Sequence, residues 1–233
     1  MDEPIVRVRR RLVLGRGGWV AVVLAAGSLA CAAGANAPAA SLTWILDSLK
    51  LVGGHAPLVL GAPQVTAGEP GIHFNGRGDG LILPVNPLAG ATEFTIEALI
   101  QPAADGEPAQ RFLHIEDEHG NRTLMEIRLL ADGRWCLDTF LLCGDNRLAL
   151  IDHSRLHPAG RWHWVALRCD GRRMDHFVDG VKEGEGTVVF TPFVGGRMSL
   201  GVRLNQAFWF GGAIREVRFY QVALAEDRLQ RLL

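Results

Sequence analysis

The sequence predicts an all-β fold in which two antiparallel sheets pack as a sandwich. Apolar residues alternate with polar ones in short runs, and these runs recur about every ten residues between turns rich in Gly, Asp and Asn. Of the 233 residues, 48% are hydrophobic, which is enough for one large core. Residues 41–233 are therefore expected to form a single domain.

The N-terminal segment, residues 1–37, is predicted to be a signal peptide. A basic region with five arginines precedes an apolar run at residues 19–33, and small residues at 30–40 offer several cleavage points. The run is shorter than the roughly 20 residues of a membrane-spanning helix, so no transmembrane span is expected. We expect an exported protein that is periplasmic, extracellular or associated with the cell envelope. Cys31, in the run SLAC, weakly resembles a lipoprotein processing site and is a candidate lipid anchor.

The net charge bears on the class of partner, and the cysteines bear on disulfides and metal binding. The formal net charge is −1, and no cluster of Lys or Arg is interleaved with aromatic residues, so nucleic acid is not an expected partner. After the signal, Cys136, Cys143 and Cys169 remain, which permits one disulfide and one free thiol in an oxidising compartment. The sequence does not indicate which two would pair. No Cys/His spacing suggests zinc.

The strands can be followed in order from the start of the domain. Residues 41–50 fit either a first strand or a short helix. Two strand runs flank a turn at residues 75–80, whose Arg77-Gly78-Asp79 fits turn chemistry better than a cell-adhesion motif. Residues 94–102 alternate well, with Phe94, Ile96, Ala98 and Ile100 on the inward side.

The second half of the domain contains further strands and one predicted helix. Asp170-Gly171 joins two strands within residues 161–180, and His176 lies on the inward side of the second. Residues 198–203 and 213–220 supply two more strands. Residues 223–233 are expected to form a short amphipathic helix whose leucines dock onto the domain.

Residues 111–139 form the predicted centre of the functional site, as two hairpins that share a strand. The turn Ala131-Asp132-Gly133 places Glu126 opposite Asp138. Matching Ile115 to Met125 in the first hairpin places His114 opposite Glu126 as well. Because two opposed carboxylates repel each other, a cation is expected beside them, and Arg128 is the candidate.

Five motifs of the domain resemble those of a known family. FNGRGDGLILP, FTIEALIQP, WHWVALRCDG, MDHFVDG and FGGAIREVRFYQVAL occur in the order found in a laminin-G-like jelly roll. The chain from about residue 44 to 233 thus resembles this branch of the concanavalin A-like lectin/glucanase superfamily. The resemblance implies a two-sheet antiparallel jelly roll whose concave face often binds glycans, sometimes with calcium. Some members are glycoside hydrolases or polysaccharide lyases.

These observations predict a secreted or periplasmic, non-catalytic, lectin-like carbohydrate-binding module. Phe112 and Trp209 would stack on sugar rings, and Glu126, Asp138 and Glu97 are candidate calcium ligands. The expected ligand-binding residues are His114, Glu126, Arg128, Asp138, Glu97 and Trp209. One alternative is a carbohydrate-active enzyme that uses His114, Glu126 and Asp138 on the same concave face. Another is a structural cell-envelope protein that binds other proteins.

Overall fold

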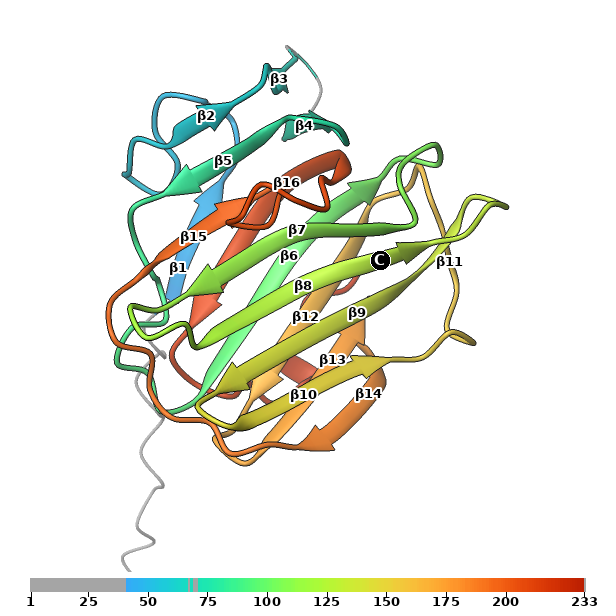
Figure 1. The fold of residues 1–233 in the computed structure, drawn as a ribbon. Coiled ribbons are helices and arrows are strands. Elements are labelled where there is room, and N and C mark those ends of the chain that lie inside the picture. Colours follow the sequence, from blue (N-terminus) through green and yellow to red (C-terminus); the bar gives the residue numbers. More distant parts are fainter. Residues whose placement is uncertain (1–40, 67, 69–70, 233) are drawn as a thin grey trace, which may run out of the picture. The chain divides into compact units, whose positions relative to one another are not determined.

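The computed structural model describes residues 41–66, 68 and 71–232. The predicted signal peptide at residues 1–37 and the candidate anchor Cys31 lie outside these residues. Within them, no helix is long and apolar enough to span a membrane. The described chain forms two antiparallel sheets of eight strands each, which confirms the predicted sandwich (Figure 1).

The first sheet, sheet 1, contains the strands at the two ends of the domain and the long strand β6. Its strands are β1 (Ser41–Ile45), β3 (Gln64–Val65), β4 (Ile72–Asn75), β6 (Phe94–Pro102), β12 (His163–Cys169), β13 (Arg173–Val178), β14 (Val181–Thr187) and β16 (Gly211–Tyr220). The strand order is β14-β13-β12-β6-β16-β4-β3, with β1 also paired to β16. The two interpretations of residues 41–50 are thereby resolved in favour of a strand.

The second sheet, sheet 2, holds the residues predicted to form the site. Its strands are β2 (Leu58–Leu60), β5 (Gly80–Leu83), β7 (Ala109–Glu116), β8 (Arg122–Leu129), β9 (Arg134–Cys143), β10 (Asn146–Ile151), β11 (His157–Pro158) and β15 (Arg197–Leu200). The order is β10-β9-β8-β7-β15-β5-β2, with β11 paired to β9. The chain crosses between the sheets at several points, for example from β5 to β6 and back from β6 to β7.

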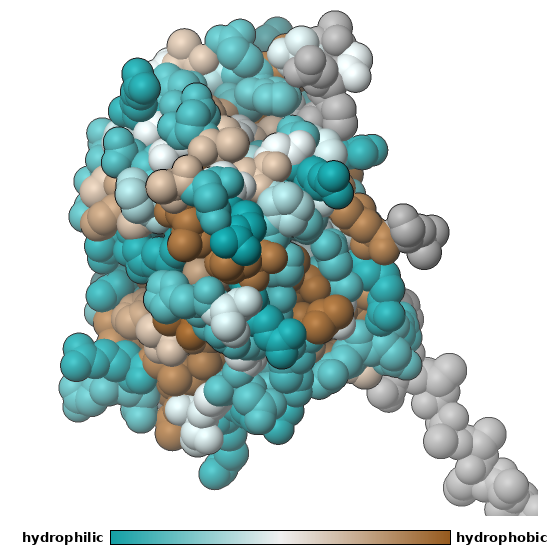
Figure 2. Space-filling view, turned by 90° about the vertical axis from the view of Figure 1, so that its right-hand side faces the viewer, coloured by the Kyte–Doolittle hydropathy of each residue, from teal (hydrophilic) through white to brown (hydrophobic). Residues whose placement is uncertain are grey.

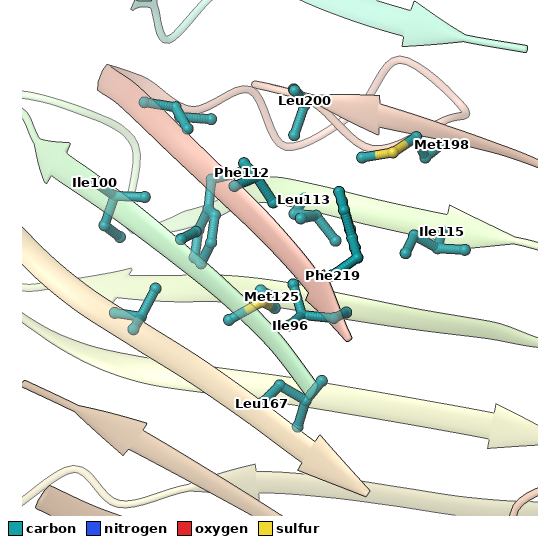
Figure 3. Packing of buried hydrophobic residues seen from close by; sticks show 14 of the residues in the cluster. Ile96, Ile100, Phe112, Leu113, Ile115, Met125, Leu167, Met198, Leu200 and Phe219 are labelled. Atoms are coloured by element: carbon teal, nitrogen blue, oxygen red, sulfur yellow. The ribbon is translucent and has the colours of Figure 1, made fainter. Parts of the chain in front are cut away.

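The core lies between the two sheets. Figure 3 shows Ile96 and Ile100 of sheet 1 together with Leu113 and Met125 of sheet 2 in one cluster. The predicted inward side of β6 is confirmed, since its alternating apolar residues are fully buried. His176 is also buried, and its Nδ1 lies 3.0 Å from the Thr139 hydroxyl of the facing sheet. The side of the molecule in Figure 2 is mainly hydrophilic around separate apolar patches.

The hairpin between β8 and β9 has the predicted register. Glu126 pairs with Asp138, and the Leu130 N–H donates to the Arg134 carbonyl at 2.8 Å. Gly133 in the turn has φ of +76°, a conformation that favours glycine. The turn therefore fixes the register as the sequence indicated.

The hairpin between β7 and β8 differs from the prediction. His114 pairs with Leu124 and not with Glu126. The turn is tighter than expected, because the Asp117 N–H donates to the Asn121 carbonyl at 2.9 Å. The Asp117 carboxylate also accepts the Asn121 N–H at 2.9 Å, which holds this shorter turn in place.

A β-bulge at Phe112 shifts the pairing once more. Arg111 pairs with Glu126, and the next paired residues are Leu113 and Met125, so Phe112 is the extra residue. Its ring is fully buried in the core (Figure 3). The prediction that Phe112 is available to stack on a sugar ring is therefore wrong.

One further prediction is corrected at the end of the chain. The predicted helix at 223–233 is a single 3-10 turn, Glu226–Arg228, and Ala225 before it makes no capping side-chain bond. Leu229 docks into the domain as predicted, whereas Leu232 is exposed. The cysteines of the described chain are free, buried thiols: Cys136, Cys143 and Cys169.

The Arg77-Gly78-Asp79 turn holds two segments together. The Asp79 carboxylate is buried and accepts N–H groups from Ala62 at 2.8 Å and Asn75 at 3.0 Å. The structure thus supports the turn interpretation of this tripeptide.

The buried position of Phe112 predicts a large effect on stability. We expect Phe112→Ala to lower the free energy of unfolding by about 3–5 kcal/mol, since it leaves a cavity in the core. Phe208→Ala is the matched control, because the Phe208 side chain is 43% exposed. Urea unfolding followed by tryptophan fluorescence measures both. Equal, small losses would contradict the bulge.

Candidate functional site

A row of charged side chains lies on the outer face of sheet 2. Arg111 of β7, Glu126 of β8 and Asp138 of β9 pair across the three strands. Their neighbours along β8, Met125 and Ile127, point into the core on the other face. The place predicted for His114 in this row is therefore occupied by Arg111.

Two arginines neutralise the opposed carboxylates. Arg128 contacts both, with its Nη2 3.3 Å from Glu126 Oε2 and its Nε donating to Asp138 Oδ2 at 2.8 Å. Arg111 Nη2 lies 2.9 Å from Glu126 Oε2. The cation expected beside the carboxylates is thus Arg128, and Arg111 is a second cation that the sequence did not indicate. We call Arg111, Glu126, Arg128 and Asp138 the polar row.

Burial changes the proton affinities within the polar row. Burial raises the pKa of Glu126 to about 6, although the positive charge of Arg111 opposes the increase. The same burial lowers the pKa of Arg111, against the attraction of Glu126. The charge of the row therefore depends on pH near neutrality.

His114 is on the same face of the sheet but away from Glu126. The Leu204 N–H, in the segment 201–210 between β15 and β16, donates to His114 Nδ1 at 3.0 Å and helps to bury the ring. Its Nε2 lies 3.6 Å from a carboxylate oxygen of Glu116. The predicted contact with Glu126 is wrong, because the tighter turn moves β7 along β8.

The electrostatic surroundings keep this imidazole neutral. Burial, and to a lesser degree the positive charges of nearby arginines, lower the pKa of His114 to about 3. These arginines are Arg203, Arg122, Arg197 and Arg111. His114 therefore acts as a hydrogen-bond acceptor that holds the segment 201–210.

Glu97 belongs to the other sheet and does not join the polar row. It lies on β6, where its Oε1 accepts the Gln230 N–H at 2.6 Å, and burial raises its pKa. The predicted shared face with Glu126 is wrong, because alternation along a strand does not determine which sheet the strand joins.

The candidate calcium ligands do not fit a calcium site. Glu97 is in sheet 1, while Glu126 and Asp138 are already bound by the Arg128 guanidinium. Calcium needs 6–8 oxygen ligands in typical protein sites. Among the residues described, no group of three His, Cys, Asp or Glu side chains could hold a metal ion.

A pocket of about 180 Å³ opens beside the polar row. We call it the arginine pocket, and its lining residues are Arg111, Arg122, Leu124, Glu126, Phe140 and Arg203. A second pocket of about 120 Å³ shares Arg203 and includes His114, Glu116 and Arg197. Sequence reasoning missed both Arg122 and Arg203. Arg203 comes from a segment far from β8 in the chain, and periodicity does not show that the two segments meet.

The aromatic ring beside the row is Phe208 rather than the predicted Trp209. The Arg111 guanidinium carbon lies 3.7 Å from the centre of the Phe208 ring, a cation–π contact. Phe208 is 43% exposed and has φ of +59°, which is uncommon for a residue other than glycine. Trp209 is only partly exposed and packs near Gly80.

The sequence matches one family over most of the domain. The family described as the concanavalin A-like lectin/glucanases superfamily matches residues 75–230. The chain belongs to this superfamily. The match confirms the resemblance seen in the five motifs. None of the curated protein sequences matches the chain.

Several solved structures share the fold at low sequence identity. Domain 4 of AbnA, an extracellular arabinanase from Geobacillus stearothermophilus solved with arabinotriose, is 20% identical, with a TM-score of 0.52 over 80% of this chain and 94% of that one. A SAP-like pentraxin from Limulus polyphemus is 15% identical, with a TM-score of 0.54 over 70% and 81%. Trypanosoma rangeli sialidase is 17% identical with a TM-score of 0.56, over 79% of this chain and 31% of the sialidase. At these identities the likeness concerns the fold.

The pKa of His114 gives a direct test of its surroundings. In NMR titrations, its imidazole should stay neutral down to about pH 4, because its pKa is about 3 in the folded protein. Unfolded chains protonate histidine near pH 6.5, so the contribution of this site to stability is present above about pH 6.5 and is lost as the pH falls towards 3. His114→Gln identifies the resonance. A titration midpoint near pH 6.5 would show that the His114 ring is exposed to solvent and would contradict its burial.

The raised pKa of Glu126 predicts that its contribution to stability falls as the pH rises, which is opposite to that of His114. Between pH 4.5, the ordinary pKa of a glutamate, and about pH 6, the folded chain keeps a proton that the unfolded chain releases. The contribution of this carboxyl to stability is present below pH 4.5 and is lost as the pH rises through 6. Glu126→Gln should therefore gain about 2 kcal/mol relative to the wild type between pH 4 and pH 7.

Urea unfolding at the two pH values measures this difference. Glu118→Gln, at an exposed residue of the neighbouring turn, is the control. A Glu126→Gln difference that does not change with pH would contradict the buried position of the carboxyl.

Proposed function

We propose that the protein is a non-catalytic carbohydrate-binding module whose binding surface is the outer face of β7, β8 and β9. The observation that carries this proposal is an exposed aromatic ring, Phe208, directly beside the polar row. The basic and apolar N-terminal sequence supports a place outside the cytoplasm, periplasmic or extracellular.

The polar row offers the groups that sugar hydroxyls need. Arg111 and Arg128 are hydrogen-bond donors, and Glu126 and Asp138 are acceptors. Ion pairs among these four side chains already fix their positions, so little side-chain freedom is lost when a ligand binds. The arabinanase domain solved with arabinotriose supports a sugar ligand for this fold.

The geometry favours binding over catalysis. Arg128 engages both carboxylates, whereas general acid–base catalysis needs a group that is free to exchange a proton with the substrate. His114 lies opposite Leu124 under the segment 201–210, so it does not form an acid–base pair with Glu126. Of the three residues of the enzyme alternative, Glu126 and Asp138 are thus paired as predicted, but His114 does not join them.

Removing the exposed ring tests the proposed surface. We expect Phe208→Ala to weaken binding to the preferred polysaccharide about tenfold, through the loss of ring stacking. Affinity electrophoresis in gels that contain neutral or acidic polysaccharides measures the effect. Val181→Ala, at an exposed position on β14 of sheet 1, is the control and should bind like the wild type.

Two outcomes would contradict the proposal. Equal retardation of Phe208→Ala and the wild type in every gel would remove the surface assignment. The appearance of new reducing ends or unsaturated sugars during incubation would show that the protein is an enzyme.

A further inference from the structure

The arginine pocket and its neighbour contain more positive than negative charge. Four arginines surround His114, namely Arg111, Arg122, Arg197 and Arg203. Within the described part of the chain, the structure gives only Arg111 of these four an ion pair, which it makes with Glu126. Glu126 also forms an ion pair with Arg128, so one carboxylate is shared between two guanidinium groups. Glu116 of the second pocket is the other carboxylate in the two linings, so four arginines face two carboxylates and positive charge is in excess.

The pocket also contains buried donors that lack acceptors. Nε and Nη1 of Arg111 and Nε of Arg122 are buried without a hydrogen-bond partner. An unsatisfied buried donor on a charged group is costly, and native proteins rarely keep one without a reason. Because these atoms have almost no exposed surface, the two guanidinium groups must turn towards the pocket before the oxygens of a ligand can satisfy them.

The shape of the pocket limits what can enter it. Leu124 is buried in its lining, and the Arg122 guanidinium lies 5.6 Å from the centre of the Phe140 ring. Its volume of about 180 Å³ is small. Pockets that enclose a whole small molecule usually measure roughly 300–1,000 Å³. The pocket therefore suits one charged group of a ligand that continues outside it.

We propose that the arginine pocket binds the acidic group of an anionic glycan, a carboxylate or a sulfate. Arg122 and Arg203 supply planar donors that match two oxygens at once, the geometry in which arginine binds carboxylates and similar oxyanions. Phe208, whose ring stacks on the Arg111 guanidinium, contacts the sugar ring that carries the group. This inference rests on the proposed carbohydrate binding and specifies its ligand class.

Comparing acidic with neutral polysaccharides distinguishes recognition of the charged group from recognition of the sugar itself. The probes are polygalacturonate for carboxylates, dextran sulfate for sulfates, and galactan and dextran as their neutral counterparts. Affinity electrophoresis of the wild-type protein should show binding to at least one acidic member and weaker binding to its neutral counterpart. The acidic polymer that is retained identifies the source of the charge. Binding should weaken as salt is added, since charged contacts at the surface are screened.

Variants then locate the charge within the protein. Arg203→Gln and Arg122→Gln should each weaken binding of the acidic polymer about tenfold, because each removes a charge-assisted contact. Arg161→Gln removes the same charge at an exposed residue outside the pocket and should bind like the wild type. Thermal unfolding checks that each variant is folded, and the two pocket variants give independent tests.

Every other outcome overturns the inference, and each does so in a distinguishable way. Equal binding of neutral and acidic polymers would leave the proposed carbohydrate binding standing and remove the anionic specificity. Acidic binding that Arg161→Gln weakens as much as Arg203→Gln would show general attraction to the surface. No retardation by any of the four polymers would contradict the carbohydrate-binding proposal itself.

Discussion

The arrangement of side chains on the outer face of β7, β8 and β9 depends on one extra residue in β7. Leu113 and Ile115 both face the core, so strict alternation would also send Arg111 inward and turn Phe112 to the outside. An unpaired guanidinium among apolar side chains costs far more free energy than a local interruption of the sheet. The bulge at Phe112 places the phenyl ring in the core and brings Arg111 to Glu126 on the outer face.

The parts of this face that could be predicted from the sequence are those fixed by local chemistry. The turn at Asp132-Gly133 determines the register of β8 against β9, so the pairing of Glu126 with Asp138 follows from a few residues. The repulsion of these carboxylates then requires a cation, and Arg128, two residues along β8, is the nearest on the same side. Alternation and turn type were sufficient here, as they were for the fold class.

The parts that could not be predicted depend on contacts between distant segments or on small differences in turns. Whether the loop after Asp117 closes with Asn121 or two residues further along is decided by side-chain hydrogen bonds that periodicity does not show. Glu97 has the predicted parity but lies in sheet 1, because β6 joins sheet 1 although the strands before and after it in the chain, β5 and β7, belong to sheet 2. Arg203 and Phe208 reach the face only through the path of residues 201–210.

His114 connects the position of residues 201–210 to the positive charge of the arginine pocket. Only a neutral imidazole can accept the Leu204 N–H at Nδ1, and the positive field of the surrounding arginines opposes its protonation. The segment held by this bond carries Arg203 and is therefore itself a source of that field. The arginines that make the pocket attractive to an anion thus also hold the segment that completes it. A bound anion would reduce the field at His114, while the burial of the ring, which is the largest cause of its low pKa, would keep the imidazole neutral and the segment in place.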